Sequence, residues 1–209
     1  MTTHPKPKAD GYSGIWYEIP GAYCGGLGTY CAKHRPFAVY RPEVDKTFFC
    51  YGGSDGRSLL HMVSYFNHDT GTVPRPTILL DKQTMDAHDN PVISMDPDGH
   101  IWVFSTSHGR GRPSFIHRSV RPHDIERFER VEAEWRLDGK VVPLENFSYM
   151  QPWWVPGRGI VAFVTRYQAP VLRTTGFMTS SDGRSWSAWQ RRGVAGQGHY
   201  QVSAMCGER

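Results

Sequence analysis

The sequence predicts an all-β protein in which short antiparallel strands alternate with tight turns. Gly and Pro are frequent, with 22 and 15 of the 209 residues, which is typical of many turns rather than of long helices. Hydrophobic residues make up 39% of the chain and aromatic residues 13%, enough for a core. A strand–turn–strand unit also recurs along the chain. These observations together indicate four-stranded antiparallel blades of a β-propeller.

The recurring unit is an apolar strand, a turn that contains Gly, and a second apolar strand. The predicted hairpins span residues 48–66, 92–106, 149–167 and 176–189, with turns near Gly56, Gly99, Gly157 and Gly183. A further hairpin is expected between residues 14 and 40. Only the segment HDIERFERVEAE, at 123–134, has a helical pattern, and we expect one short helical turn at 124–130.

These hairpins account for only part of a propeller. Blades take roughly 40 to 50 residues each, so the chain supplies about half to two-thirds of a closed ring. A propeller closes to protect its edge strands. We therefore expect residues 1–209 to be a single domain, the N-terminal portion of a longer propeller. Such an incomplete propeller should be poorly stable and prone to aggregate when expressed alone.

The most informative stretch places a histidine at each end of one hairpin. His88 precedes the strand at 92–95, and His108 follows the return strand at 101–105. A hairpin returns the chain to the end it left, so the two imidazoles should lie close together on one rim. Both are surrounded by small or polar residues such as Asp86 and Ser107. We expect a functional site there.

Charge and cysteine content exclude several classes of function. The formal net charge of +4 suits an anionic substrate and is also typical of an ordinary basic surface. Basic residues are scattered, without a recognition helix or a stacking sheet, so no nucleic-acid partner is expected. The four Cys lack metal-finger spacing and the His lack regular ligand spacing, so we expect neither a metal nor a cofactor. Cys50 lies in an apolar strand and is expected in the core.

The sequence carries no visible targeting or membrane segment. The opening residues MTTHPKPKAD contain no apolar stretch of a signal peptide, and no run is long enough to span a bilayer. We expect no membrane partner. The complete protein is nevertheless expected to be secreted or periplasmic, and monomeric.

The pentapeptide SDGRS occurs twice, at 54–58 and 181–185, and the second copy continues into Trp186. The second copy resembles a shortened Asp-box, the turn of sialidase-like propellers that is also called the BNR repeat. In such a turn the Asp side chain accepts backbone N–H groups, Gly takes a positive φ, and the aromatic ring packs below. The motif is structural and does not identify a reaction.

With these residues in view, the chain resembles BNR-repeat proteins of the sialidase-like superfamily, and is similar within it to the propeller polysaccharide lyases that act on ulvan. The resemblance runs from GYSGIW at 11–16 through KTFFCYGG at 46–53 to GHYQ at 198–201. Its most specific part is the order and spacing of four polar residues, His88, His108, Tyr149 and Arg166.

The resemblance implies β-elimination on an acidic, uronate-containing polysaccharide or oligosaccharide. Elimination across C4 and C5 needs the carboxylate neutralised, a base for the C5 proton and an acid for the leaving oxygen. The planar fork of Arg166 matches a carboxylate, and His108 can share that role. His88 is a base or proton shuttle. Tyr149 either protonates the glycosidic oxygen or takes the C5 proton, and the sequence leaves the two assignments open.

Further substrate contacts are expected nearby, and each candidate also has a structural explanation. The expected substrate-binding residues are His34, Asn90, Arg112, Trp153 and Tyr200. Rim histidines often only hydrogen-bond the surface, and Arg166 can instead pair with an internal carboxylate. Consecutive Trp residues in a strand point to opposite faces, so one of Trp153 and Trp154 should be core.

Two other functions remain open. One is a non-catalytic carbohydrate-binding propeller whose rim histidines hydrogen-bond a glycan. The other is a sialidase-like glycoside hydrolase, a weaker reading because the early Arg and the acid/base Asp of that family have no counterparts here. Fold alone cannot separate these functions.

Overall fold

The structure is a computed structural model, and it describes residues 35–54, 58–84, 86, 88–169, 172–191 and 202–206. The first sheet contains β1 (Ala38–Arg41), β2 (Lys46–Ser54), β3 (Leu59–Asn67) and β4 (Thr77–Asp81), in that order. The second contains β5 (Pro91–Met95), β6 (Ile101–Ser105), β7 (Phe115–Ser119) and β8 (Phe128–Val131). The third contains β11 (Ser148–Val155), β12 (Gly159–Ala169), β13 (Leu172–Ser180) and β15 (Gln190–Arg191).

A smaller sheet joins β10 (Lys140–Pro143), β9 (Glu134–Leu137) and β14 (Ser185–Trp186). Pairing is antiparallel throughout the three larger sheets, whereas β14 runs parallel to β9. A 3-10 turn at Pro42–Val44 is the one helical element among the described residues. The described part contains no helix long and apolar enough to cross a membrane.

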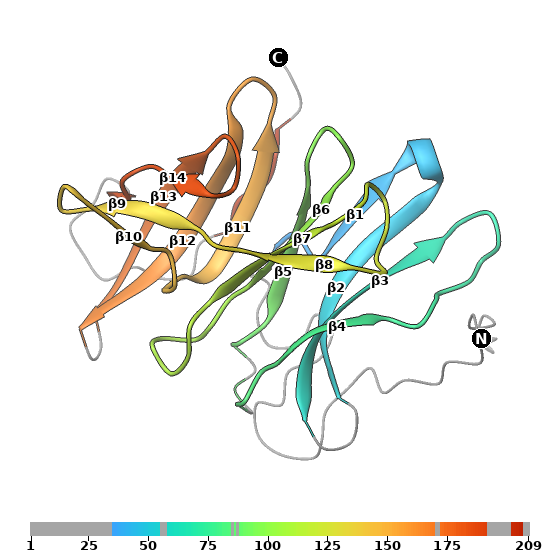
Figure 1. Cartoon of the computed structure of the whole chain (residues 1–209), viewed down its shortest axis with the longest axis horizontal. Coiled ribbons are helices and arrows are strands. Elements are labelled where there is room, and N and C mark those ends of the chain that lie inside the picture. Colours follow the sequence, from blue (N-terminus) through green and yellow to red (C-terminus); the bar gives the residue numbers. More distant parts are fainter. Residues whose placement is uncertain are drawn as a thin grey trace.

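The three larger sheets stand side by side, with the second, green to yellow in Figure 1, between the first and the third. Strand β5 contacts β1 and β2 on one side and β11 on the other. The leading strand of each sheet is therefore innermost, and later strands follow outward, as in the blades of a β-propeller. The predicted all-β, incomplete propeller of four-stranded antiparallel sheets is confirmed.

Period-2 alternation on β6 builds a core on each face of the second sheet. Ile101 and Val103 pack toward the first sheet, in a cluster with Phe48 and Cys50. Trp102 and Phe104 pack in the opposite direction, toward the third sheet. Successive side chains of a strand point to opposite faces, so a strand that is apolar at every position is buried on both sides. Cys50 is a free thiol in this core, as predicted.

Three of the predicted hairpins form as expected, namely β2–β3, β5–β6 and β11–β12. Residues 55–57 of the first turn, and nearly all of the hairpin expected between 14 and 40, lie outside the described residues. The fourth hairpin differs, because β14 leaves β13 after the turn and pairs with β9. Trp186 is 3% exposed in the core between the second and third sheets. Because this ring is buried there, β14 lies beside β9, and β15 pairs with β13 in its place.

The helical turn predicted at 124–130 is wrong. Residues 128–131 form β8, which completes the second sheet with the pairs Ile116↔Val131 and Ser119↔Phe128. Ile125 and Phe128 pack in the core shared with the first sheet, and Val131 packs in the other core. Edge pairing and burial on two faces outweigh the weak local preference for helix.

The turn of the second SDGRS copy, which continues into Trp186, has the three features expected from its sequence. The Asp182 carboxylate accepts backbone N–H bonds from Arg184 and Ser185, each at 2.8 Å. Gly183 has φ 71°, and the six-membered part of the Trp102 ring lies where a Cβ would stand. The Trp186 indole N–H donates to the Gly183 carbonyl at 2.9 Å. The other copy includes residues outside the described part.

Candidate active site

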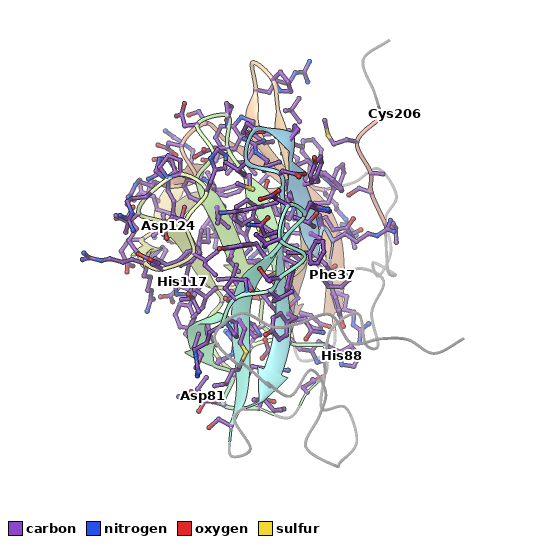
Figure 2. All side chains as sticks on the ribbon, turned by 90° about the vertical axis from the view of Figure 1, so that its right-hand side faces the viewer. Phe37, Asp81, His88, His117, Asp124 and Cys206 are labelled. Carbon is purple, nitrogen blue, oxygen red and sulfur yellow. The ribbon has the colours of Figure 1, made fainter. Side chains whose placement is uncertain are left out.

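The residues that flank the β5–β6 hairpin meet at one end of the sheets. Figure 2 shows His88 toward the same end as Asp81, with Asp124 toward the opposite end. The rings of His88 and His108 stack with centroids 4.4 Å apart and an interplanar angle of 20°. The prediction that the hairpin brings these two imidazoles together on one rim is therefore confirmed.

A single carboxylate, that of Asp86, links the two rings. Asp86 Oδ1 lies 2.5 Å from His88 Nδ1, and Asp86 Oδ2 lies 2.5 Å from His108 Nδ1. An ionised carboxylate only accepts hydrogen bonds, so both rings carry a proton on Nδ1. When a ring is neutral, its Nε2 is then the acceptor. Asp86 is not among the site residues predicted from the sequence, although its place two residues before His88 suits an Asx turn. Its Oδ1 also accepts the His88 backbone N–H at 2.9 Å.

The charges of this cluster follow from its contacts. Burial alone would raise the pKa of Asp86, but hydrogen bonds from the His88 backbone and from the rings of His88 and His108 outweigh it and lower that pKa to about 2. Burial lowers the pKa of His88 below its usual value, against the opposing effect of Asp86, and the charges of His108 and Arg173 act in the same direction as burial. His88 is therefore neutral at pH 7 and carries a basic lone pair on Nε2.

Tyr149 points its ring at this pair from β11. Its ring centroid lies 6.2 Å from that of His88 and 5.9 Å from that of His108, both in edge contacts. Tyr149 has φ 49°, which is uncommon for a bulky residue, and it lies where the β11–β12 register shifts between Ser148 and Gln151. Such bulges re-aim side chains, often next to active sites.

Two residues of the β12–β13 hairpin complete the cluster. The Tyr167 ring meets the His108 ring edge-on at 5.5 Å. The Arg173 guanidinium lies 5.5 Å from the Tyr167 ring centroid, and the two residues are register partners. Neither Tyr167 nor Arg173 is among the site residues predicted from the sequence. The hairpin rule that brought His88 to His108, applied one hairpin further along, would have found them.

Arg166 does not join the histidine pair, contrary to the sequence-based expectation. Its guanidinium lies 4.2 Å from the Trp135 ring centroid and 5.7 Å from that of Trp189. Successive side chains of a strand point to opposite faces, and Tyr167 occupies the position toward His108. Burial lowers the pKa of Arg166 and the charge of Asp138 raises it, without removing the positive charge.

Arg112 lines the same cavity as His108 and Asp86, which has a volume of about 240 Å³. Its guanidinium nevertheless forms hydrogen bonds and an ion pair within the protein. It donates to the carbonyls of Lys82, Thr106 and Pro113 at 3.1, 3.0 and 2.7 Å, and it forms an ion pair with Asp89. These contacts give Arg112 a structural role, and its expected role in substrate binding stays a prediction. They tie the segment that carries Asp86 and His88 to the loop after β6.

Two further expected substrate-binding residues, Asn90 and Trp153, make contacts within the protein. Asn90 is 2% exposed, and its carbonyl accepts a hydrogen bond from Thr106 Oγ1 at 2.7 Å. Trp153 lies four residues along β11 from Tyr149, about 13 Å, and donates to Ser203 Oγ at 2.8 Å. Trp154 packs against the core, so the expected split of the two Trp residues is confirmed. His34 and Tyr200 lie outside the described residues.

Among the described residues, one group offers three donor atoms to a metal ion, all within 4.8 Å of one another: Asp86, His88 and His108. Two nitrogens and a carboxylate suit zinc in type. However, each carboxylate oxygen lies 2.5 Å from a ring nitrogen. Ligands placed tetrahedrally about 2.0–2.1 Å from zinc lie about 3.3 Å apart. The distances fit hydrogen bonds and do not fit an ion between these atoms.

No protein-family model matches the chain, and no curated protein matches it. Among solved structures, it is similar to an ulvan lyase of polysaccharide lyase family PL25, with a TM-score of 0.61 and 17% identity over 85% of this chain and 41% of that one. It is likewise similar to such a lyase bound to -[GlcA(1-4)Rha3S]-, with a TM-score of 0.58 and 17% identity over 76% of this chain and 38% of that one. The chain thus spans about two-fifths of the lyase, and the likeness is one of fold.

Proposed function

We propose that the chain belongs to a carbohydrate-active propeller, a polysaccharide lyase that cleaves an ulvan-like, uronate-containing acidic polysaccharide by β-elimination. The observation that carries the proposal is the stacked pair of His88 and His108, bridged by the carboxylate of Asp86. The edge contacts of Tyr149 with both rings add a phenol to the same rim. The fold shared with an ulvan lyase that was solved with a glucuronate-containing oligosaccharide supports the substrate class.

The reaction breaks the C5–H and C4–O bonds of the uronate and forms a C4–C5 double bond. His88 takes the C5 proton on Nε2, since its lowered pKa keeps this nitrogen unprotonated at neutral pH. The electron pair of the C5–H bond becomes the new double bond, and the electron pair of the C4–O bond leaves with the glycosidic oxygen. Tyr149 donates its hydroxyl proton to that oxygen. His108, when protonated, presents an N–H that stabilises the charge on the carboxylate.

The test is to incubate the complete protein with ulvan and with a carboxyl-reduced ulvan. Absorbance near the ultraviolet edge from an unsaturated uronate should rise with ulvan and stay flat with the reduced polymer. New reducing ends without that absorbance would contradict elimination and support a hydrolase. Binding without cleavage would instead support the carbohydrate-binding propeller.

The roles of the two proton-transfer residues are tested by His88→Ala and Tyr149→Phe. Each should lower turnover by roughly 100-fold or more while substrate binding changes little, since both groups transfer protons in the transition state. The assignment of the base is tested by the pH profile. If His88 is the base, His88→Ala removes the acidic limb, whereas loss of that limb in Tyr149→Phe alone would make Tyr149 the base.

A further inference from the structure

The proposed elimination needs a fixed cation for the uronate carboxylate, and Arg166 faces the Trp135 ring on the other side of β12. We propose that Arg173 binds this carboxylate and so sets the preference for acidic sugars. The inference rests on the proposed function and names the residue that selects its substrate.

The register of the β12–β13 hairpin places Arg173 on the face of the site. Arg173 is paired with Tyr167, close to the turn between the two strands. Residues directly opposite one another in an antiparallel pair carry their side chains on the same face of the sheet. Tyr167 uses this face to contact the His108 ring at 5.5 Å. Arg173 is therefore directed to the same rim as the histidine pair.

The contacts of Arg173 link it to the histidine pair through a single ring. Its guanidinium lies 5.5 Å from the Tyr167 ring centroid, and Tyr167 touches His108. Its positive charge also reaches His88, whose pKa it lowers. A guanidinium carries five N–H donors in one plane. A planar donor set of this kind matches a carboxylate.

Arg166 provides a matched control within the same hairpin. It belongs to the same pair of strands and is paired with Thr174, next to Arg173. Its guanidinium lies on the opposite face, against Trp135 and Trp189. The two arginines therefore share residue type, hairpin and end of the sheet, and differ in the face they serve.

The experiment compares Arg173→Lys, Arg173→Met and Arg166→Lys in the complete protein, each checked for native circular dichroism and melting temperature. Turnover is measured on ulvan. Binding of a glucuronate-containing ulvan tetrasaccharide and of its carboxyl-reduced form is measured by calorimetry. We expect kcat/KM on ulvan to fall roughly 10-fold or more in Arg173→Lys and roughly 100-fold or more in Arg173→Met. Arg166→Lys should stay within about 3-fold of the parent.

Binding separates a carboxylate contact from a merely structural role. Arg173→Met should weaken binding of the acidic tetrasaccharide and leave binding of the reduced form unchanged. Equal weakening of both, or an Arg166→Lys loss that exceeds the loss in Arg173→Lys, would overturn the inference. If the parent cleaves no uronate polymer, the proposed function fails, yet the tetrasaccharide arm still decides whether Arg173 binds the carboxylate. A parent that binds neither sugar overturns both. If Arg173→Met does not fold, Arg173→Lys, which keeps the charge, gives the answer.

Discussion

The rings of His88 and His108 stack with centroids 4.4 Å apart and an interplanar angle of 20°, and both rings bind the carboxylate of Asp86. Two unit charges at this distance would repel by about 4 kcal/mol at an effective dielectric constant of about 20. The neutral ring of the pair is His88, because burial lowers its pKa, and it is available as a base.

Asp86→Asn should lower turnover on a uronate polymer by roughly 10- to 100-fold. An amide accepts at only one atom, so it cannot receive both ring N–H groups, and its neutral side chain no longer offsets the charge of the pair. Asp98→Asn is the control, because Asp98 is an exposed residue in the turn at the other end of the β5–β6 hairpin. Parent-like turnover of Asp86→Asn would contradict the bridging role.

Tyr149→Phe should lose catalysis without losing stability. The substitution keeps the ring contacts with His88 and His108 and the backbone conformation at φ 49°, and it removes only the hydroxyl. Turnover should fall roughly 100-fold, with a melting temperature within a few degrees of the parent. Tyr40→Phe, which alters a half-exposed phenol that donates to Asp45, is the control and should leave turnover unchanged. A large drop in melting temperature for Tyr149→Phe would show that the hydroxyl is structural.

Arg112→Ala should destabilise the fold strongly. Arg112 pairs with Asp89, and their side chains are 10% and 3% exposed. Burial raises the pKa of Asp89 to about 7, and Arg112 is the main group that opposes this rise. Removal of the guanidinium leaves a buried acid without its cation and three backbone carbonyls without their donor, at a cost of about 3–5 kcal/mol in urea unfolding. Arg121 forms an ion pair with Asp124, and its side chain is 65% exposed. Arg121→Ala should therefore lower the free energy of unfolding by less than about 1 kcal/mol.

His117 should make the fold less stable in acid. Its ring is 9% exposed, and burial, aided by the charge of Arg130, lowers its pKa to about 4 from a usual value of 6.5. Between these pH values the His117 imidazole is protonated in the unfolded chain and neutral in the folded chain. The contribution of His117 to stability is therefore largest above pH 6.5 and falls as the pH drops toward 4, by up to about 3 kcal/mol.

The measurement is the free energy of unfolding at pH 7.5 and pH 4.5, by urea, for the parent and for His117→Gln. The parent should lose more stability on acidification than the variant does, since other groups with shifted pKa values act equally in both. His68→Gln serves as the control, because His68 is exposed. Equal pH dependence in the parent and His117→Gln would exclude His117 as the cause.

The sequence by itself determined the local pieces of this protein. Apolar strands separated by turn residues such as Gly99 and Gly157 predicted the hairpins. The meeting of His88 and His108 followed from one hairpin. These features depend on hydrogen bonds and two-residue periodicity within contiguous segments, so neighbouring residues encode them.

Only the tertiary structure decided which faces and which long-range partners those pieces use. The register of β11 against β12 shifts at Tyr149, and the packing of Trp135 fixes the face that Arg166 occupies. Trp186 is buried in the core, and β14 pairs with β9 instead of β13. Strand β8 forms where a helical turn was expected. Each choice depends on which sheet packs against which side. The face that each side chain occupies is therefore decided by the packing energy of the assembled core. It cannot be read from any single segment of the sequence.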